Sequence, residues 1–373
     1  MSGRPLTVLQ LLPEMEVGGV EQGTLEIAEA LVAAGHRALV VSAGGRLVPL
    51  LTAAGAQHVA LPIGRKRIGT LGLVRKLRTL MLDEAVDVVH ARSRLPAWIG
   101  HHALRGIEVS RRPHWVTTVH GPYTVNRYSR IMVSGVRVIA ISEFIREYIF
   151  GAYPDTPRER VVVIPRGVDR ARYVHGFEPS AGWLQQWRRE HPALDGRRVL
   201  CLPARLTRWK GQQDFIEMLQ RLVQHRPLVH GLMVGGPHPR KREFEAELRQ
   251  LVRDRGLESV VSFLGQRSDL REILAVSDVV YSLTRAPEAF GRTTIEALSL
   301  GRPVIGYDHG GTGEILRRVF PAGLVAVGDI EAAAARTRAL LESPVLVPVD
   351  HPFTLSAMQR ATLEVYRDVS RAG

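Results

Sequence analysis

Two carboxylates, Glu288 and Glu296, stand eight positions apart in the stretch RAPEAFGRTTIEALSLGRP. Pro287 and Gly291 mark a turn, and the residues TTIEALSL then have helical periodicity. We therefore expect Glu288 on the loop before a helix and Glu296 on the first or second turn of that helix. A helix N-terminus attracts phosphate and carboxylates accept hydrogen bonds from sugar hydroxyls, so the pattern suits a nucleotide sugar. The plain alternative is a first-turn acid followed by a solvated helix residue.

Two cations, Arg205 and Lys210, lie five positions apart in the segment RLTRWKGQQDF, directly after the apolar run RVLCLPA. The run is typical of a buried strand, and the residues after Gly211 are typical of a helix. Both cations could then converge on one diphosphate at the helix N-terminus. The alternative is a solvated basic loop. The segment is not a P-loop, because the sequence contains no G-x-x-x-x-G-K-[ST].

A third group of residues lies in the first half of the sequence. Gly18 and Gly19 follow the apolar run LTVLQLL, and His120 ends the run HWVTTVH. Open α/β sheets bind ligands at the carboxyl ends of their strands, where these three residues are expected. The glycines allow a ligand to approach the backbone, although no G-x-G-x-x-G dinucleotide fingerprint occurs there. A plain turn and a structural histidine are the alternatives.

The segments that must position these residues alternate between short apolar runs and helical patterns. Strands are predicted at residues 6–12, 38–42, 57–61, 86–90, 114–120, 137–142, 160–165, 198–204, 228–235, 259–265, 278–283, 303–307 and 323–327. The glycine-rich segment 308–316 is predicted to be a loop. Strands that alternate with helices indicate an α/β fold with parallel sheets and right-handed crossovers.

The composition is that of a globular protein with an unusual charge. The 373 residues are 45% hydrophobic and 23% charged, which allows two domains with sizeable cores. The formal net charge of +13 predicts acidic partners such as nucleic acid, anionic lipid or phosphorylated ligands. The single cysteine, Cys201, excludes an intrachain disulfide and a cysteine-based metal cluster. Residues 1–12 are too short for a secretory signal, and no apolar segment reaches the ~20 residues of a membrane span, so we expect a cytoplasmic protein.

Much of the positive charge of the first half falls within residues 65–112, which hold eleven Arg or Lys against four Asp or Glu. The basic residues of interest are Arg65, Lys66 and Arg67, followed by Arg75 and Lys76 in a leucine-rich helical pattern. A basic amphipathic helix suits the surface of an anionic bilayer. A solvated face of a soluble helix is the alternative.

Taken in order, these residues give a pattern that resembles the retaining glycosyltransferases of the GT-B fold that carry a Glu-x7-Glu signature. This family 4-like group includes bacterial enzymes of lipopolysaccharide core and surface-glycan assembly. The matching positions are Gly18-Gly19-Val20-Glu21, His120-Gly121, VIPRGVD (163–169), Arg205 through Lys210-Gly211, FLG (263–265), Glu288-Ala289-Phe290-Gly291 with Glu296, and Gly310 to Glu314. One departure is Arg166, where many relatives have asparagine.

The resemblance implies an architecture of two Rossmann-like domains whose parallel sheets face each other across a cleft. The acceptor-side domain would span residues 1–167 and the nucleotide-sugar-binding domain residues 168–350. A terminal helix within residues 351–373 would pack back towards the first domain.

The resemblance also implies roles for single residues. Arg205 and Lys210 would bind the donor diphosphate, Glu296 the ribose and Glu288 the sugar. The amides of Phe290 and Gly291 would lie near the sugar and phosphates. The backbone of Gly18 and Gly19 would lie against the donor, and His120 beside the anomeric carbon. The two cations and the helix dipoles would stabilise the leaving nucleoside diphosphate, so no metal cofactor is expected.

The expected activity is retaining transfer of a sugar from a nucleotide sugar to a hydroxyl of a glycan or lipid-linked saccharide, in lipopolysaccharide or surface-glycan assembly. The basic face suggests peripheral binding to the inner face of the cytoplasmic membrane. Alternatives are an inactive glycan- or nucleotide-binding relative and a sugar-nucleotide epimerase or phosphorylase on the same scaffold. Nucleic acid is not an expected partner, because no basic helix interleaved with exposed aromatics is predicted. The sequence does not determine the base, the sugar or the acceptor.

Overall fold

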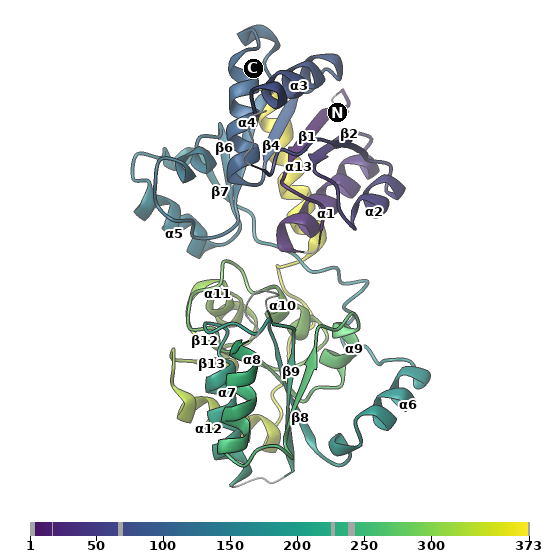
Figure 1. Ribbon diagram of the computed structural model, residues 1–373, viewed down its shortest axis with the longest axis vertical. Helices are drawn as coiled ribbons and strands as arrows, with labels where there is room; N and C mark the ends of the chain where they lie inside the picture. The colour runs from purple at the N-terminus through teal and green to yellow at the C-terminus, as the bar shows by residue number, and fades with distance from the viewer. Residues whose placement is uncertain (1–3, 17, 66–69, 225–227, 238–242, 372–373) are drawn as a thin grey trace. The chain divides into compact units, whose positions relative to one another are not determined.

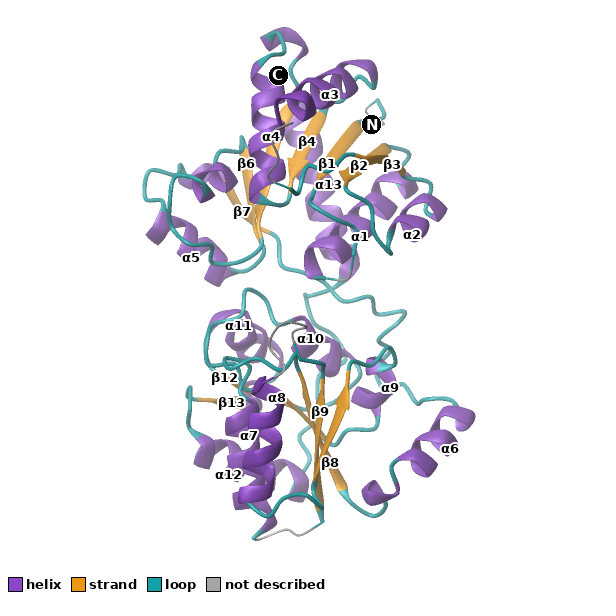
Figure 2. Cartoon of the chain, in the orientation of Figure 1, coloured by secondary structure: helices purple, strands orange, loops and turns teal. Residues whose placement is uncertain are grey.

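The computed structural model of the chain describes residues 4–16, 18–65, 70–224, 228–237 and 243–371. The chain divides into two compact units: unit 1 comprises residues 1–167 and 355–373, and unit 2 comprises residues 168–354. In each unit a sheet is flanked by helices (Figure 2). This confirms the predicted α/β class. In the described ranges no helix is both long and apolar enough to cross a membrane.

The sheet of unit 1 has the strand order β3-β2-β1-β4-β5-β6-β7 and is parallel throughout. Its strands are β1 (Thr7–Leu11), β2 (Arg37–Ser42), β3 (Gln57–Ala60), β4 (Val88–Ala91), β5 (His114–Val119), β6 (Arg137–Ala140) and β7 (Val161–Val163). Every residue of the central strands β1 and β4 is buried. Burial on both faces of a parallel sheet explains why these strands are continuous apolar runs in the sequence.

The helices of unit 1 come from both ends of the chain. They are α1 (Gly19–Ala33), α2 (Val48–Ala53), α3 (Thr70–Asp83), α4 (Arg94–Arg105), α5 (Glu143–Ala152) and α13 (Leu355–Arg371). Figure 1 shows α13, in yellow, running beside the purple α1, and Gln359 donates a hydrogen bond of 2.9 Å to the carbonyl of Glu26. Met358 and Tyr366 of α13 belong to the same hydrophobic core as Val8 of β1. The last helix is thus a structural part of unit 1.

The sheet of unit 2 has the strand order β10-β9-β8-β11-β12-β13 and is also parallel. Its strands are β8 (Arg198–Pro203), β9 (Val229–Val234), β10 (Val261–Gly265), β11 (Val279–Ser282), β12 (Val304–Tyr307) and β13 (Leu324–Val325). Its helices are α6 (Ala181–Glu190), α7 (Gln212–Val223), α8 (Glu243–Asp254), α9 (Leu270–Ala275), α10 (Arg292–Ser299), α11 (Gly310–Val319) and α12 (Ile330–Glu342). Each predicted strand of the chain overlaps one of β1 to β13.

One local prediction is wrong. The segment 308–316, expected as a loop, forms most of α11, which begins at Gly310. Its glycines lower helix propensity, yet they let the first turn of α11 pack directly on the backbone of the loop before α10. A Cβ at Gly311 would lie 2.2 Å from the carbonyl oxygen of Phe290. Close backbone packing therefore outweighs propensity at this position.

Each sheet has one pair of neighbouring strands after which the chain continues towards opposite edges of the sheet. In unit 1 these strands are β1 and β4, and in unit 2 they are β8 and β11. Such topological switch points leave a crevice at the carboxyl ends of the strands, where α/β proteins bind ligands. Gly18 and Gly19 follow β1, while Arg205 and Lys210 follow β8 and Glu288 follows β11. The fold thus puts most of the predicted site residues at the two switch points.

Candidate active site

The two switch-point loops of unit 2 are joined by an ion pair between Lys210 and Glu288. The backbone N–H of Arg285 also donates to the carbonyl of Trp209 at 2.8 Å, so the loops lie side by side. The side chains of Lys210 and Glu288 are each 16% exposed, and the Lys210 ammonium lies 4.3 Å from the centre of the Trp209 ring. A cation and a carboxylate are thus both accessible and fixed at one point of the sheet edge.

Arg205 lies on the same loop as Lys210 but is exposed. Its carbonyl accepts a hydrogen bond of 2.9 Å from Gln212 on α7, which holds the loop against the helix. Within the described part of the chain its guanidinium makes no ion pair. Gly211 caps α7 in the left-handed region at φ 78°, and a Cβ there would meet the carbonyl of Leu283 at 1.9 Å. Glycine is therefore required where the two loops meet.

The loop that carries Glu288 is held by the start of α11. The N–H of Gly311 donates to the carbonyl of Glu288 at 2.8 Å, and Gly291, at φ 94°, is the N-cap of α10. Further back along the chain, Arg285 binds both carboxylate oxygens of the buried Asp214 at 2.7 to 3.1 Å. These contacts fix the loop without using the Glu288 side chain.

Glu296 is buried on α10 and is 6% exposed. Arg292, one helical turn earlier, donates to its carboxylate at 3.0 Å, and Arg172 and Tyr173, from the segment after β7, also favour its charged form. Burial raises the pKa of Glu296, and the charges of Arg292 and Arg172 only partly offset this rise. Glu296 is therefore a desolvated carboxylate supported from two segments of unit 2.

In unit 1 the glycine loop leads into α1. Gly18 is extended at φ 175°, and a Cβ there would lie 2.3 Å from the Glu21 carboxylate. Gly19, the first residue of α1, has open space where a Cβ would stand. The backbone at Gly19 is therefore free for close approach by a ligand at a helix N-terminus.

His120 follows β5 and is bound by a residue from the far end of the unit 1 sheet. The Arg166 guanidinium, which follows β7, donates to His120 Nδ1 at 2.8 Å. His120 Nε2 is buried and has no hydrogen-bond partner among the described residues. Burial first, and then the charges of Arg166 and Arg92, hold the pKa of His120 well below its ordinary value. The imidazole is therefore neutral.

The predicted basic face is described in part. Arg65 is exposed and forms an ion pair of 3.9 Å with Glu14, and Arg75 and Lys76 are exposed on α3. Lys66 and Arg67 lie outside the described residues.

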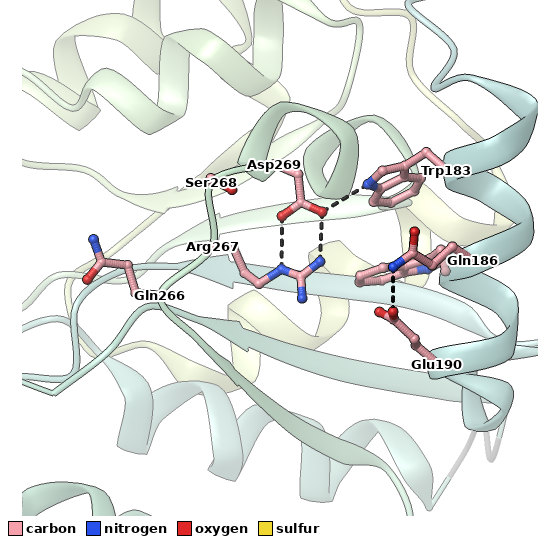
Figure 3. A pocket seen from close by; sticks show the side chains of 8 residues that line it. Trp183, Gln186, Glu190, Gln266, Arg267, Ser268 and Asp269 are labelled. Atoms are coloured by element: carbon pink, nitrogen blue, oxygen red, sulfur yellow. Dashed lines mark hydrogen bonds and ion pairs between the residues drawn. The ribbon is translucent and has the colours of Figure 1, made fainter.

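A separate cavity of about 390 Å³ lies between α6 and the loop after β10 (Figure 3). Its walls carry two stacked indoles, Trp183 and Trp187, with ring centres 4.9 Å apart. Arg267 and Trp183 both bind the carboxylate of Asp269, at 2.7 to 2.9 Å. None of the predicted site residues lines this cavity. Arg267 and Asp269 pair with each other and Glu190 accepts a hydrogen bond from Gln186, so we do not place the reaction there.

The structure thus brings Lys210 together with Glu288 and joins the glycine-rich start of α11 to Phe290. Sequence reasoning missed the supporting residues of the site. The i,i+4 spacing of Arg292 and Glu296 was a readable signal, whereas the Tyr173 contact had none. Arg166 stood out only as a departure from the family pattern. In the described ranges no group of three or more His, Cys, Asp or Glu side chains is arranged to hold a metal ion.

Comparison with known proteins covers both units. Residues 17–172 match the family described as Glycosyltransferase Family 4, and residues 185–353 match Glycosyl transferases group 1. The chain is 28% identical to the phosphatidyl-myo-inositol mannosyltransferase of Mycolicibacterium smegmatis, over 95% of this chain and 92% of that protein. It is 27% identical to the lipopolysaccharide core biosynthesis mannosyltransferase LpsB of Rhizobium meliloti, over 59% of this chain and 63% of that protein.

Solved structures show the same architecture. A glycosyltransferase from Rickettsia africae has a TM-score of 0.87 at 27% identity, covering 98% of this chain and 99% of that one. Anabaena HepE, solved in complex with UDP-glucose, has a TM-score of 0.80 at 23% identity, covering 97% and 100%. With a family 4 match in unit 1, a group 1 match in unit 2 and this shared fold, the chain belongs to the GT-B glycosyltransferases.

Proposed function

We propose that this protein moves a sugar from a nucleoside-diphosphate sugar to a hydroxyl of a glycan or lipid-linked saccharide, with retention of anomeric configuration. The observation that carries the proposal is the ion pair of Lys210 with Glu288 at the switch point of unit 2. One partner suits a diphosphate and the other suits sugar hydroxyls, which are the two halves of such a donor. The UDP-glucose held by Anabaena HepE is a ligand of this class.

In the proposed reaction the charges of unit 2 act on the leaving group. Lys210 and the exposed Arg205 bind the diphosphate, together with the N-terminus of α7 and the amides of Phe290 and Gly291. Their positive charge stabilises the nucleoside diphosphate as the bond to the sugar breaks, a role that needs no metal ion. Glu288 accepts hydrogen bonds from hydroxyls of the transferred sugar, and Glu296 accepts them from the ribose.

Unit 1 is proposed to act on the sugar and the acceptor. The backbone of Gly18 and Gly19 and the His120 ring provide hydrogen-bond donors for saccharide oxygens. Tyr123, which accepts a hydrogen bond from the His120 backbone N–H, lies 5.0 Å from the Arg94 guanidinium, measured to the ring centre, and the ring centre of Tyr128 lies 5.6 Å from it. Aromatic faces next to a cation are suited to a phosphorylated or saccharide acceptor.

The acceptor is proposed to be membrane-linked. The exposed basic residues Arg65, Arg75 and Lys76 of unit 1 support peripheral binding to the inner face of the cytoplasmic membrane. The names of two relatives, one a phosphatidyl-myo-inositol and one a lipopolysaccharide core mannosyltransferase, support a lipid-linked acceptor in surface-glycan assembly.

The proposal is tested with nucleotide sugars and the purified full chain. We expect one nucleotide sugar to raise the melting temperature, because a ligand that binds only the folded state stabilises it. Incubation of that donor with saccharide and glycolipid acceptors should give a product whose anomeric configuration, read by NMR, equals that of the donor. A product of inverted configuration would refute the retaining mechanism. Full transfer by Glu288→Gln with the native substrates would refute the placement of Glu288 at the sugar.

A further inference from the structure

The contact between Arg166 and His120 fixes the position of the ring proton. A guanidinium has only N–H donors and cannot accept a hydrogen bond. Since Arg166 Nη2 lies 2.8 Å from His120 Nδ1, that ring nitrogen must present its lone pair. In a neutral imidazole the single proton is then on Nε2.

Arg166 is itself held in place by two helices. The residue is 9% exposed, and its Nη1 lies 3.8 Å from the Met358 sulfur on α13. On the α1 side the guanidinium lies against Gly23, where a Cβ would be 2.2 Å from Nη1 and 2.7 Å from Cζ. Gly23 thus leaves the space that the guanidinium occupies. Any larger residue at position 23 would have to displace it.

The charged and titratable groups around His120 all keep the ring neutral. Arg166, Arg92 and His90 each lower its pKa, in addition to burial. Around Arg92, α1 contributes Glu26 and α13 contributes Tyr366, while Tyr123 on the loop of His120 accepts a hydrogen bond of 3.2 Å from the His120 backbone N–H. No carboxylate is among the groups that act directly on the His120 ring. Protonation of Nδ1 would also break its bond to Arg166.

Two nitrogens of this cluster, His120 Nε2 and Arg92 Nη2, are buried without a hydrogen-bond partner among the described residues. Leaving a buried N–H unpaired is unfavourable. By contrast, the neighbouring His90 has both ring nitrogens paired at 2.6 Å, with Tyr366 and Thr118. The Nε2–H of His120 is therefore a donor that a ligand oxygen can satisfy.

We propose that Arg166 is a positioning residue that holds His120 as the neutral Nε2–H tautomer, so that His120 meets the saccharide as a hydrogen-bond donor and acts as neither a general base nor a general acid. The inference rests on the proposed function for the identity of the ligand, a sugar oxygen. It assigns Arg166, Gly23 and Met358 a shared task, which is to present one N–H. No covalent step passes through His120.

The tautomer is tested by NMR on the full chain labelled with [15N]histidine, with His120→Gln to assign the signals. Two-bond proton–nitrogen spectra should show His120 with a protonated Nε2 and an unprotonated Nδ1, unchanged between about pH 5 and 8. In Arg166→Met the His120 ring should populate both tautomers, and its pKa should rise but stay below the ordinary value, because burial, Arg92 and His90 still lower it. A protonated Nδ1 in the unaltered chain, or unchanged signals in Arg166→Met, would overturn the proposal.

A second variant covers the case in which Arg166→Met does not fold. Gly23→Ala keeps the arginine but should displace its guanidinium and give the same His120 signals as Arg166→Met. It should add nothing when the two are combined, because both remove one contact. Gly72→Ala, on α3 where a Cβ meets nothing, is the matched control and should leave His120 unchanged. Unaltered His120 signals in Gly23→Ala would contradict the role of Gly23.

Transfer kinetics give an independent readout. Arg166→Met should lower kcat/KM about tenfold at pH 8, through loss of a charge-assisted hydrogen bond to the ring. This deficit should shrink as the pH falls towards the pKa of His120 in the variant, because an imidazolium carries a proton on Nε2 in any case. A deficit that does not change with pH would mean a purely structural role. Because the NMR result needs no substrate, failure of the proposed transfer activity would leave the tautomer assignment intact.

Discussion

Replacing Lys210 by methionine tests the central charge of the site in unit 2. The change keeps most of the apolar stem and removes the ammonium that pairs with Glu288. Loss of one preorganised charge at a leaving group costs about 2–4 kcal/mol of barrier. This converts to a decrease of about 30- to 900-fold in kcat/KM.

The same substitution affects stability, because it leaves the Glu288 carboxylate without its partner. Breaking a fully buried pair costs about 3–5 kcal/mol and breaking an exposed one about 0–1 kcal/mol. With both side chains 16% exposed, we expect an intermediate cost of about 2 kcal/mol. For a domain of the size of unit 2 this lowers the melting temperature by about 4–8 °C.

The double variant Lys210→Met with Glu288→Gln separates the two effects. It removes the unpaired carboxylate, so the melting temperature should return towards that of the unaltered protein, while transfer activity should not. Steady-state kinetics and thermal melting of the three variants are the measurements. Recovery of activity in the double variant would show that Lys210 only neutralises Glu288 and does not act on the diphosphate, which would refute the proposed role.

Three further predictions concern other parts of the molecule. Glu296→Gln should raise the melting temperature at pH 7.5, because burial raises the pKa of this carboxyl and its charged form is unfavourable in the folded state. The stabilisation should disappear as the pH falls below about 4.5, where the carboxyl of the unfolded chain is also protonated. The same variant should bind the donor more weakly in calorimetry. Gly311→Ala should cost about 1–3 kcal/mol and weaken donor binding, since its Cβ would meet the Phe290 carbonyl, whereas Gly182→Ala, with open space at its Cβ, should do neither in the same assays. Replacing Arg65, Arg75 and Lys76 by glutamine should weaken binding to anionic vesicles by roughly 1 kcal/mol per charge in a sedimentation assay. The control variant replaces the exposed Arg188, Arg189 and Arg336 of unit 2 by glutamine and should bind the vesicles as tightly as the unaltered protein. Equal weakening in both variants would mean that net charge alone sets the binding.

The strands could be predicted because a parallel strand buried on both faces leaves a continuous apolar run, as in β1 and β8. The start of α11 could not, because local propensity at Gly310 and Gly311 argues for a loop. The helix forms there because these glycines pack against Glu288 and Phe290, more than twenty positions away in sequence. Local helix propensity does not include the effect of that long-range contact.

The residue types of the candidate site could be predicted from the sequence, but the contacts between those residues could not. Lys210 and Glu288 were each expected at a ligand, but nothing in their spacing of 78 residues indicates that they bind each other. Arg166 reaches His120 because the ends of β7 and β5 lie at the same edge of one sheet. A contact of this kind depends on strand order, which residue periodicity alone does not determine.

The membership of α13 in unit 1 bears on how the protein is made. Residues 168–354 form unit 2 without interruption, so this unit can fold as soon as it has left the ribosome. Unit 1 begins earlier but lacks Met358, Leu363 and Tyr366 of its core until α13 emerges. During synthesis the first half of the chain therefore waits with an open apolar face while the second half completes its fold. Translation can finish unit 2 before unit 1.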